Sequence, residues 1–170
     1  MVQKTIQYSN VTISDVTHRF FNSYGNSFSL SEVIDEIRNY MNDNDYNYNL
    51  IIGSDSQRYD GHISFVTAII IQKVGKGGRF FYFKNAVHHP MSLQYRLLTE
   101  ATYSVEILEK IKISDIYLDL HNIEVHVDVS ENGKSRSFIK ECMSYIRGLG
   151  YDCKIKPDGY GASKVADRYT

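Results

Sequence analysis

Three consecutive apolar stretches between residues 50 and 87 constrain the fold more than any other part of the chain. LIIGSD comes first, HISFVTAIIIQKV second and RFFYFKNAV third. β-branched and aromatic residues favour strands, and the connections SQRYDG and KGGR are short. Because short connections join antiparallel neighbours, we predict a three-stranded antiparallel meander.

The remainder of the chain alternates between helical and strand patterns. Apolar residues recur with a helical period over 93–111, and NIEVHVDVS (122–130) returns to strict alternation. A helix over 135–149, a short strand over 151–157 and a last helix over 162–169 follow. This order predicts an α/β fold: a mixed five-stranded sheet of three antiparallel strands followed by αβαβα, with helices on both faces.

The N-terminal part adds one further predicted helix. In FSLSEVIDEIRNYM the apolar residues have helical spacing, and Ser29 and Glu32 fit a capping box. A length of 170 residues is typical of one domain. We therefore predict a single domain over 1–170, with an N-terminal extension (1–48) and a core (49–170).

Composition narrows the class of protein. The 19 basic and 20 acidic residues nearly cancel, which excludes a polybasic arm but not a local basic stripe. Cys142 and Cys153 lack the CxxC spacing of zinc sites, so reduced thiols are the simplest interpretation. The N-terminus has no signal-peptide core, and the run FVTAIIIQ is too short to span a membrane. We expect a cytoplasmic protein that does not bind membranes.

Three acidic residues occupy positions that a hydrophobic core disfavours. Asp55 ends an apolar strand, Asp128 interrupts a valine-rich strand, and Glu100 lies on an apolar helical stripe. A right-handed crossover would place the strand 122–130 beside the strand 50–55, so that the two aspartates become neighbours. Clustered carboxylates repel one another, and a hard divalent cation such as Mg²⁺ would neutralise them.

Each acid also has a local explanation. Asp55 could form a turn, Asp128 could face solvent from its strand, and Glu100 could lie on an exposed helix margin. His126 alternates onto the same face as Asp128, where a hydrogen bond to a neighbouring side chain is a simpler role than supporting a metal ligand.

The order of elements and acids resembles the ribonuclease H-like fold. More closely, IIGSDSQ, GHISFVTAIII, HVDVSENGKS and KIKPDGYGASKVADRYT resemble the bacterial YkuK-like family of ribonuclease H-like proteins, over about residues 49–170. The resemblance implies that Asp55, Glu100 and Asp128 are catalytic metal ligands. It implies Asp167 as the fourth acid, with Asp158 as the alternative.

The resemblance implies hydrolysis of phosphodiester bonds in RNA, DNA or a hybrid, assisted by two Mg²⁺ or Mn²⁺ ions. Such a nuclease needs phosphate contacts outside its metal site. The candidate substrate-binding residues flank Asp55 or carry positive charge near the later loops and helices: Ser56, Gln57, Lys134, Arg136, Lys156 and Lys164. For any one of these lysines, a solvated surface position is the simpler interpretation.

Two other functions fit the same sequence. A non-catalytic ribonuclease H-like module would keep the fold and bind nucleic acid or a protein partner. A structural protein would use the acids only to tune its stability. Asp167 is the residue that distinguishes these functions least clearly. Instead of binding a metal, it could be an exposed helical residue that pairs with Lys164 or Arg168.

Overall fold

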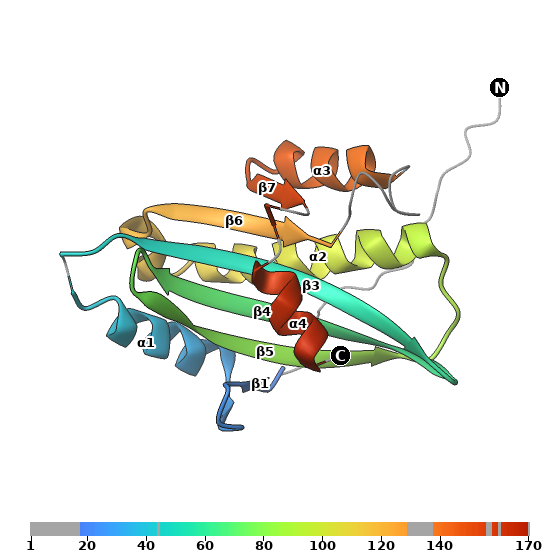
Figure 1. The fold of residues 1–170 in the computed structure, drawn as a ribbon, viewed down its shortest axis with the longest axis horizontal. Helices are drawn as coiled ribbons and strands as arrows, with labels where there is room; N and C mark the ends of the chain where they lie inside the picture. The colour runs from blue at the N-terminus through green and yellow to red at the C-terminus, as the bar shows by residue number, and fades with distance from the viewer. Residues whose placement is uncertain (1–17, 44, 129–137, 156–157, 160, 170) are drawn as a thin grey trace.

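A computed structural model describes residues 18–43, 45–128, 138–155, 158–159 and 161–169. Its centre is one seven-stranded sheet in the order β2-β1-β5-β4-β3-β6-β7 (Figure 1). The strands are β1 (Phe20–Phe21), β2 (Ser27–Phe28), β3 (Tyr48–Tyr59), β4 (His62–Lys73), β5 (Gly77–Val87), β6 (Asn122–Val127) and β7 (Asp152–Ile155). The helices are α1 (Leu30–Tyr40), α2 (Leu93–Lys112), the 3₁₀ helix Asp115–Asp119, α3 (Ile139–Gly148) and α4 (Gly161–Tyr169).

The mixed α/β architecture is as predicted, but the strand count is not. The meander β3–β4–β5 is antiparallel, and β6 and β7 join it in parallel. The prediction of five strands was wrong because β1 and β2 extend the sheet beyond β5. Each of these strands has only two residues, which is too short to show a period in the sequence.

The strand β3 is longer than its apolar stretch. All of its residues from Tyr48 to Tyr59 pair with β4, and the turn that follows is only Asp60 and Gly61. Gly61 has φ 84°, a left-handed conformation that a two-residue hairpin turn requires. Asp55 therefore lies inside a strand, and the expectation that it ends one was wrong.

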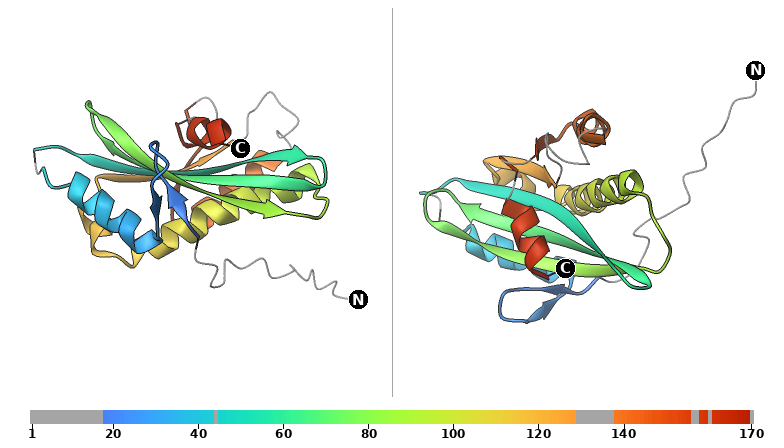
Figure 2. Two further views of the ribbon diagram at one scale, coloured as in Figure 1. Left: turned by 90° about the horizontal axis from the view of Figure 1, so that it is seen from below. Right: turned by 45° about the vertical axis from the view of Figure 1, so that its right-hand side comes forward.

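The two faces of the sheet are covered differently. α1 and α2 lie on one face and α4 crosses the other, as the edge-on view in Figure 2 shows. The main core fills the α2 face, where Leu50 and Ile52 of β3 meet Leu97 and Ile107 of α2. α1 begins as predicted, because Ser29 and Glu32 form both hydrogen bonds of a capping box.

The α4 face has a smaller apolar cluster and a very close approach between backbone elements. Val66 and Ala68 of β4 pack against Ala166 of α4. A Cβ atom on Gly53 would lie 2.6 Å from the Cβ of Ala162 and 2.7 Å from the backbone oxygen of His126. The absence of a side chain at Gly53 therefore lets α4 lie directly on β3.

Neither cysteine is in a disulfide, and both are buried. Burial raises the pKa of each thiol to about 11. Among the described helices, none is both long enough and apolar enough to cross a membrane.

Candidate acidic site

Asp55 and Asp128 lie at matching positions on two parallel strands. The last paired residues of β3 and β6 are Ser54 and Val127, and each aspartate is the next residue of its chain segment. Alternation places both aspartates on the same face as the pair Gly53 and His126, which is the α4 face. The adjacency expected from a right-handed crossover is thus present, with both aspartates half-buried.

Glu100 approaches from the other face of the sheet. It lies on α2 and is only 2% exposed. Its Oε1 accepts a hydrogen bond from the Ser56 hydroxyl at 2.5 Å, whereas its Oε2 is buried without a hydrogen-bond partner. Because Glu100 is buried, the alternative that it lies on an exposed helix margin is wrong.

Burial and nearby charges hold Glu100 in its protonated form at neutral pH. The pKa of Glu100 is raised to about 8, chiefly because burial removes the carboxyl from water and also because of the negative charges of Asp55 and Asp128. The hydrogen bond from Ser56 and the charge of Arg96 act in the opposite direction. The three predicted acids therefore interact electrostatically.

Arg96 is a site residue that the sequence reasoning missed. Its Nε donates to the Ser56 hydroxyl and its Nη2 donates to the Ser56 backbone oxygen, both at 2.9 Å. Arg96 lies one helical turn before Glu100, so the two side chains share a side of α2. The i, i+4 spacing of Arg96 and Glu100 was the signal in the sequence that could have identified Arg96. The pair of contacts to Ser56 fixes α2 against the middle of β3.

A row of buried hydroxyl groups continues this contact between α2 and the sheet. The Ser54 hydroxyl lies 2.8 Å from the Thr67 hydroxyl and 2.9 Å from the Ser104 hydroxyl. Ser104 also donates to the backbone oxygen of Glu100 at 3.0 Å. These bonds satisfy polar groups inside the core and hold the helix backbone at Glu100 in place.

His126 is hydrogen-bonded to Glu124, as the simpler interpretation of its position anticipated. Its Nε2 lies 2.9 Å from Glu124 Oε2, and Lys154 donates to Glu124 Oε1 at 2.6 Å. His126 is 4% exposed, and burial lowers its pKa despite the neighbouring carboxylate. This neutral imidazole lies beside the acids, with its buried Nδ1 lacking a hydrogen-bond partner.

The oxygen atoms of these acidic side chains are of the type that a hard divalent cation prefers as ligands. The three predicted carboxylates would supply oxygen ligands, and the buried Oε2 of Glu100 has no hydrogen-bond partner. In the ranges that the structure describes, however, no three His, Cys, Asp or Glu side chains are already grouped closely enough to hold a metal ion.

The predicted fourth acid and its neighbours lie on or near α4. Asp167 and Lys164 are exposed. Asp167 follows Ala166, which packs on Val66, the cross-strand partner of Asp55. The alternative acid, Asp158, is exposed in a turn before α4. The identity of the fourth acid stays a prediction.

The other predicted substrate contacts fall into two groups. Lys134, Arg136 and Lys156 lie outside the described residues. Ser56 is 7% exposed and bonds to Glu100 and Arg96 inside the protein, whereas Gln57 is exposed on the α4 face. Gln57 Oε1 accepts a bond from the Tyr59 hydroxyl at 3.4 Å.

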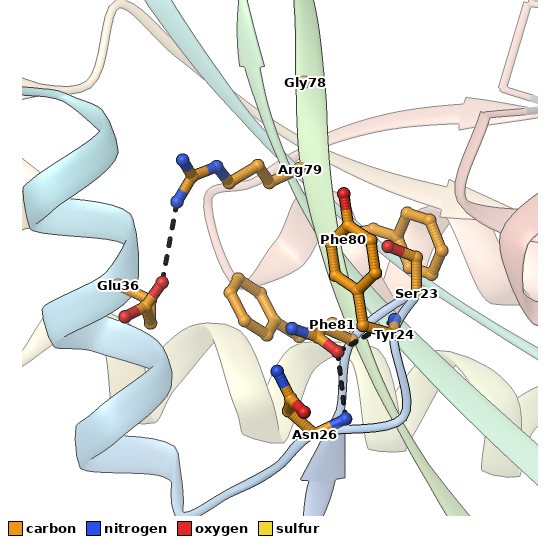
Figure 3. Close-up of a pocket in the computed structure, with 9 residues that line it drawn as sticks. Ser23, Tyr24, Asn26, Glu36, Gly78, Arg79, Phe80 and Phe81 are labelled. Atoms are coloured by element: carbon orange, nitrogen blue, oxygen red, sulfur yellow. Dashed lines mark hydrogen bonds and ion pairs between the residues drawn. The ribbon is translucent and has the colours of Figure 1, made fainter.

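A pocket of about 410 Å³ lies at the opposite end of the sheet from these acids. It is formed by the β1–β2 loop, α1 and the first residues of β5, and an ion pair of 3.5 Å joins Arg79 to Glu36 there (Figure 3). Its β5 residues pair with the end of β4 that faces the start of β3. The pocket and the acids are therefore separate features.

Comparisons with known proteins agree with the fold. The model of the family described as ribonuclease H-like matches residues 32–170. The chain is 30% identical to the uncharacterized protein YkuK of Bacillus subtilis over 165 residues, covering 89% of this chain and 96% of that protein.

A solved structure of endonuclease V from Ciona intestinalis is also similar. It contains a 24mer DNA with an inosine followed by a ribo-adenosine. The match has 12% sequence identity and a TM-score of 0.40, and it covers 82% of this chain and 64% of that one. With a family model over most of its length and a YkuK relative, this chain belongs to the YkuK-like ribonuclease H-like family.

Proposed function

We propose that this protein is a Mg²⁺- or Mn²⁺-dependent nuclease that hydrolyses phosphodiester bonds of nucleic acid. One observation carries the proposal: a buried glutamate, Glu100, has its pKa raised to about 8, in part by Asp55 and Asp128. Asp55 and Asp128 follow the last paired residues of β3 and β6, and their negative charges act on the buried carboxyl of Glu100, which is costly without a compensating cation. Membership of the ribonuclease H-like family supports the same reading.

Asp55, Glu100 and Asp128 would hold the cation, with Asp167 as the fourth carboxylate. A bound divalent ion supplies Lewis-acid activation of water and stabilises charge on the phosphate oxygens. Within the chain, the bonds of Ser56 with Glu100 and Arg96 hold this part of α2 against β3, directly beside Asp55 in the sequence of the strand. Glu100 must lose its proton before it can act as a ligand, so cation binding is expected to strengthen as pH rises toward about 8.

Cleavage assays with a matched pair of variants test the proposal. The wild-type protein with Mn²⁺ should cut at least one of RNA, DNA or a hybrid, and Asp55→Asn should abolish the activity because it removes a ligand charge. Asp60→Asn is the control, since Asp60 is an exposed acid of the β3–β4 turn and its loss should leave the rate unchanged. Activity that survives in Asp55→Asn would refute the assignment.

A thermal-shift experiment tests cation binding separately from catalysis. Mn²⁺ should raise the melting temperature of the wild-type protein by mass action. The shift should disappear in Asp128→Asn. If millimolar Mn²⁺ leaves the wild-type melting temperature unchanged, the acids do not form a cation site.

A non-catalytic nucleic-acid-binding module is the second candidate. It is favoured by the absence, among the residues placed by the structure, of a ready-made group of three metal-binding side chains. Such a module would bind nucleic acid with a strong dependence on salt and would not cleave it in the presence of Mn²⁺ or Mg²⁺.

A further inference from the structure

Three aromatic rings lie in a row at the end of the β3–β4 hairpin. Tyr59 and His62 are cross-strand partners whose ring centroids lie 5.1 Å apart with an interplanar angle of 13°. His88 follows β5 beside His62, with 5.7 Å between centroids. We call Tyr59, His62 and His88 the ring row. Neighbouring strands are about 4.8 Å apart, which is close to the distance between stacked rings.

The ring row lies on the same face of the sheet as the acidic site. Along β3, Asp55, Gln57 and Tyr59 alternate onto the α4 face. Asp55 lies in a cross-strand row with Val66 and Lys84. Tyr59 is the fourth residue after Asp55 along the strand, which corresponds to a distance of about 13 Å.

One row of residues lies between these two rows. Gln57, Ser64 and Ala86 form the intervening row, in which Gln57 and Ala86 are exposed. Tyr59 is 40% exposed. α4 packs on the sheet around Val66 and Ala68, and in Figure 1 the β3–β4 turn extends beyond this helix. Two of the three residues in this middle row, Ser64 and Ala86, have small side chains.

We propose that the ring row is a stacking platform for a base of single-stranded nucleic acid, whose backbone crosses the middle row to reach the acidic site. Aromatic rings bind unpaired bases with little sequence preference. Lys84, exposed in the same row as Asp55, is placed to contact a phosphate. Bases inside a duplex are already stacked on one another, so the platform selects unpaired strands. The inference rests on the proposed function, because it names the substrate of that site.

Metal-free binding assays isolate the platform from catalysis. The full chain, with a chelator present, is titrated into a fluorescently labelled thymidine single strand and into an abasic strand of the same length. Tyr59→Ala should weaken binding of the thymidine strand about fivefold or more, as expected for the loss of one base–aromatic contact. His62→Ala removes the ring that stacks on Tyr59 and should weaken this binding by a smaller factor. The abasic strand should bind equally to all variants, since it offers no base.

Two further variants serve as controls. Tyr24→Ala removes a tyrosine that is 87% exposed at the other end of the sheet, and it should change neither affinity. Tyr59→Phe keeps the ring and should bind the thymidine strand like the wild type. Unchanged melting temperatures verify that each variant is folded.

Three results would overturn the platform. These are thymidine-strand affinity that is unchanged in both Tyr59→Ala and His62→Ala, equal losses for the thymidine and abasic strands, and a duplex that binds as tightly as the single strand. Failure of the nuclease proposal looks different. In that case no Mn²⁺-dependent cleavage occurs, while the base-specific loss in Tyr59→Ala remains.

Discussion

The two halves of β3 differ in how they contact α2. In the first half, Tyr48–Gly53, the side chains of Leu50 and Ile52 are fully buried in the main core. In the second half, Ser54–Tyr59, the side chains on the same face are Ser54 and Ser56, which reach α2 through hydrogen bonds. A single strand thus passes from apolar packing to polar contacts at Gly53.

The first half of β3 therefore contributes most to stability, whereas the candidate acidic site lies at the second half. Hydrogen bonds to β4 run along the whole strand, so the second half keeps its geometry without a large apolar core. Positions in that half can therefore hold acids and exposed polar groups. Substitutions in the first half should affect folding, and those in the second half should affect binding and pH dependence.

The largest expected effect is in the first half. Ile52→Ala should lower the free energy of unfolding by about 2–5 kcal/mol, because it leaves a cavity in a fully buried site. Gln57→Ala, at an exposed position of the second half, should change it by less than about 0.5 kcal/mol. Urea denaturation of both variants measures the contrast, and equal losses would contradict it.

At the junction of the halves, Gly53→Ala should destabilise the protein by about 1–3 kcal/mol. The added methyl group would meet Ala162 and the backbone oxygen of His126 at under 3 Å, so α4 would have to shift. Gly148→Ala is the control, since nothing lies within 4 Å of its Cβ position. A Gly53→Ala protein as stable as Gly148→Ala would show that α4 does not rest on β3.

Glu100 of α2, which the second half contacts through Ser56, should make stability depend on pH. The unfolded state loses the Glu100 proton near pH 4.5, whereas the folded state keeps it until about pH 8. The unfolded state therefore binds fewer protons in this window, and stability falls as pH rises, by up to about 1.4 kcal/mol per pH unit.

Glu100→Gln cannot ionise, so its free energy of unfolding should fall less steeply between pH 5 and pH 8. Denaturation at several pH values, with the exposed-residue variant Glu141→Gln as control, measures the slope. If Glu100→Gln keeps the full slope of the wild type, the carboxyl of Glu100 does not hold its proton in the folded state.

The smallest expected effect is on the hydroxyl row. Ser104→Ala removes bonds to Ser54 and to the backbone of Glu100, while Ser54 keeps its contact with Thr67. The free energy of unfolding should drop by about 1 kcal/mol. Thr102→Ala removes only a hydroxyl bond to its own helix and should cost less. The reverse order would mean that the hydroxyl row does not hold α2 to the sheet.

The sequence was sufficient for the order and pairing of the long elements. Apolar periodicity located β3, β4, β5 and α2, and the handedness of crossovers placed β6 beside β3. The proximity of Asp55 and Asp128 followed from that topology alone.

Features that depend on side-chain contacts across the fold could not be predicted in this way. The residues from Ser56 to Tyr59 are polar, so the extension of β3 leaves no hydrophobic pattern and shows itself only through pairing with β4. The contacts of Arg96 and Glu100 with Ser56 join a helix to a strand far away in the sequence. The spacing of residues within one element carries no information about contacts between distant elements.

The order of the elements also determines when the acids can meet during synthesis. Asp55 and the ring row belong to the contiguous meander β3–β4–β5, whose contacts are mostly local. Glu100 and Asp128 reach Asp55 only after α2 and β6 have emerged, and such distant contacts form late. A nascent chain that ends at the meander therefore carries the open surface without the acidic cluster, which only the nearly complete chain assembles.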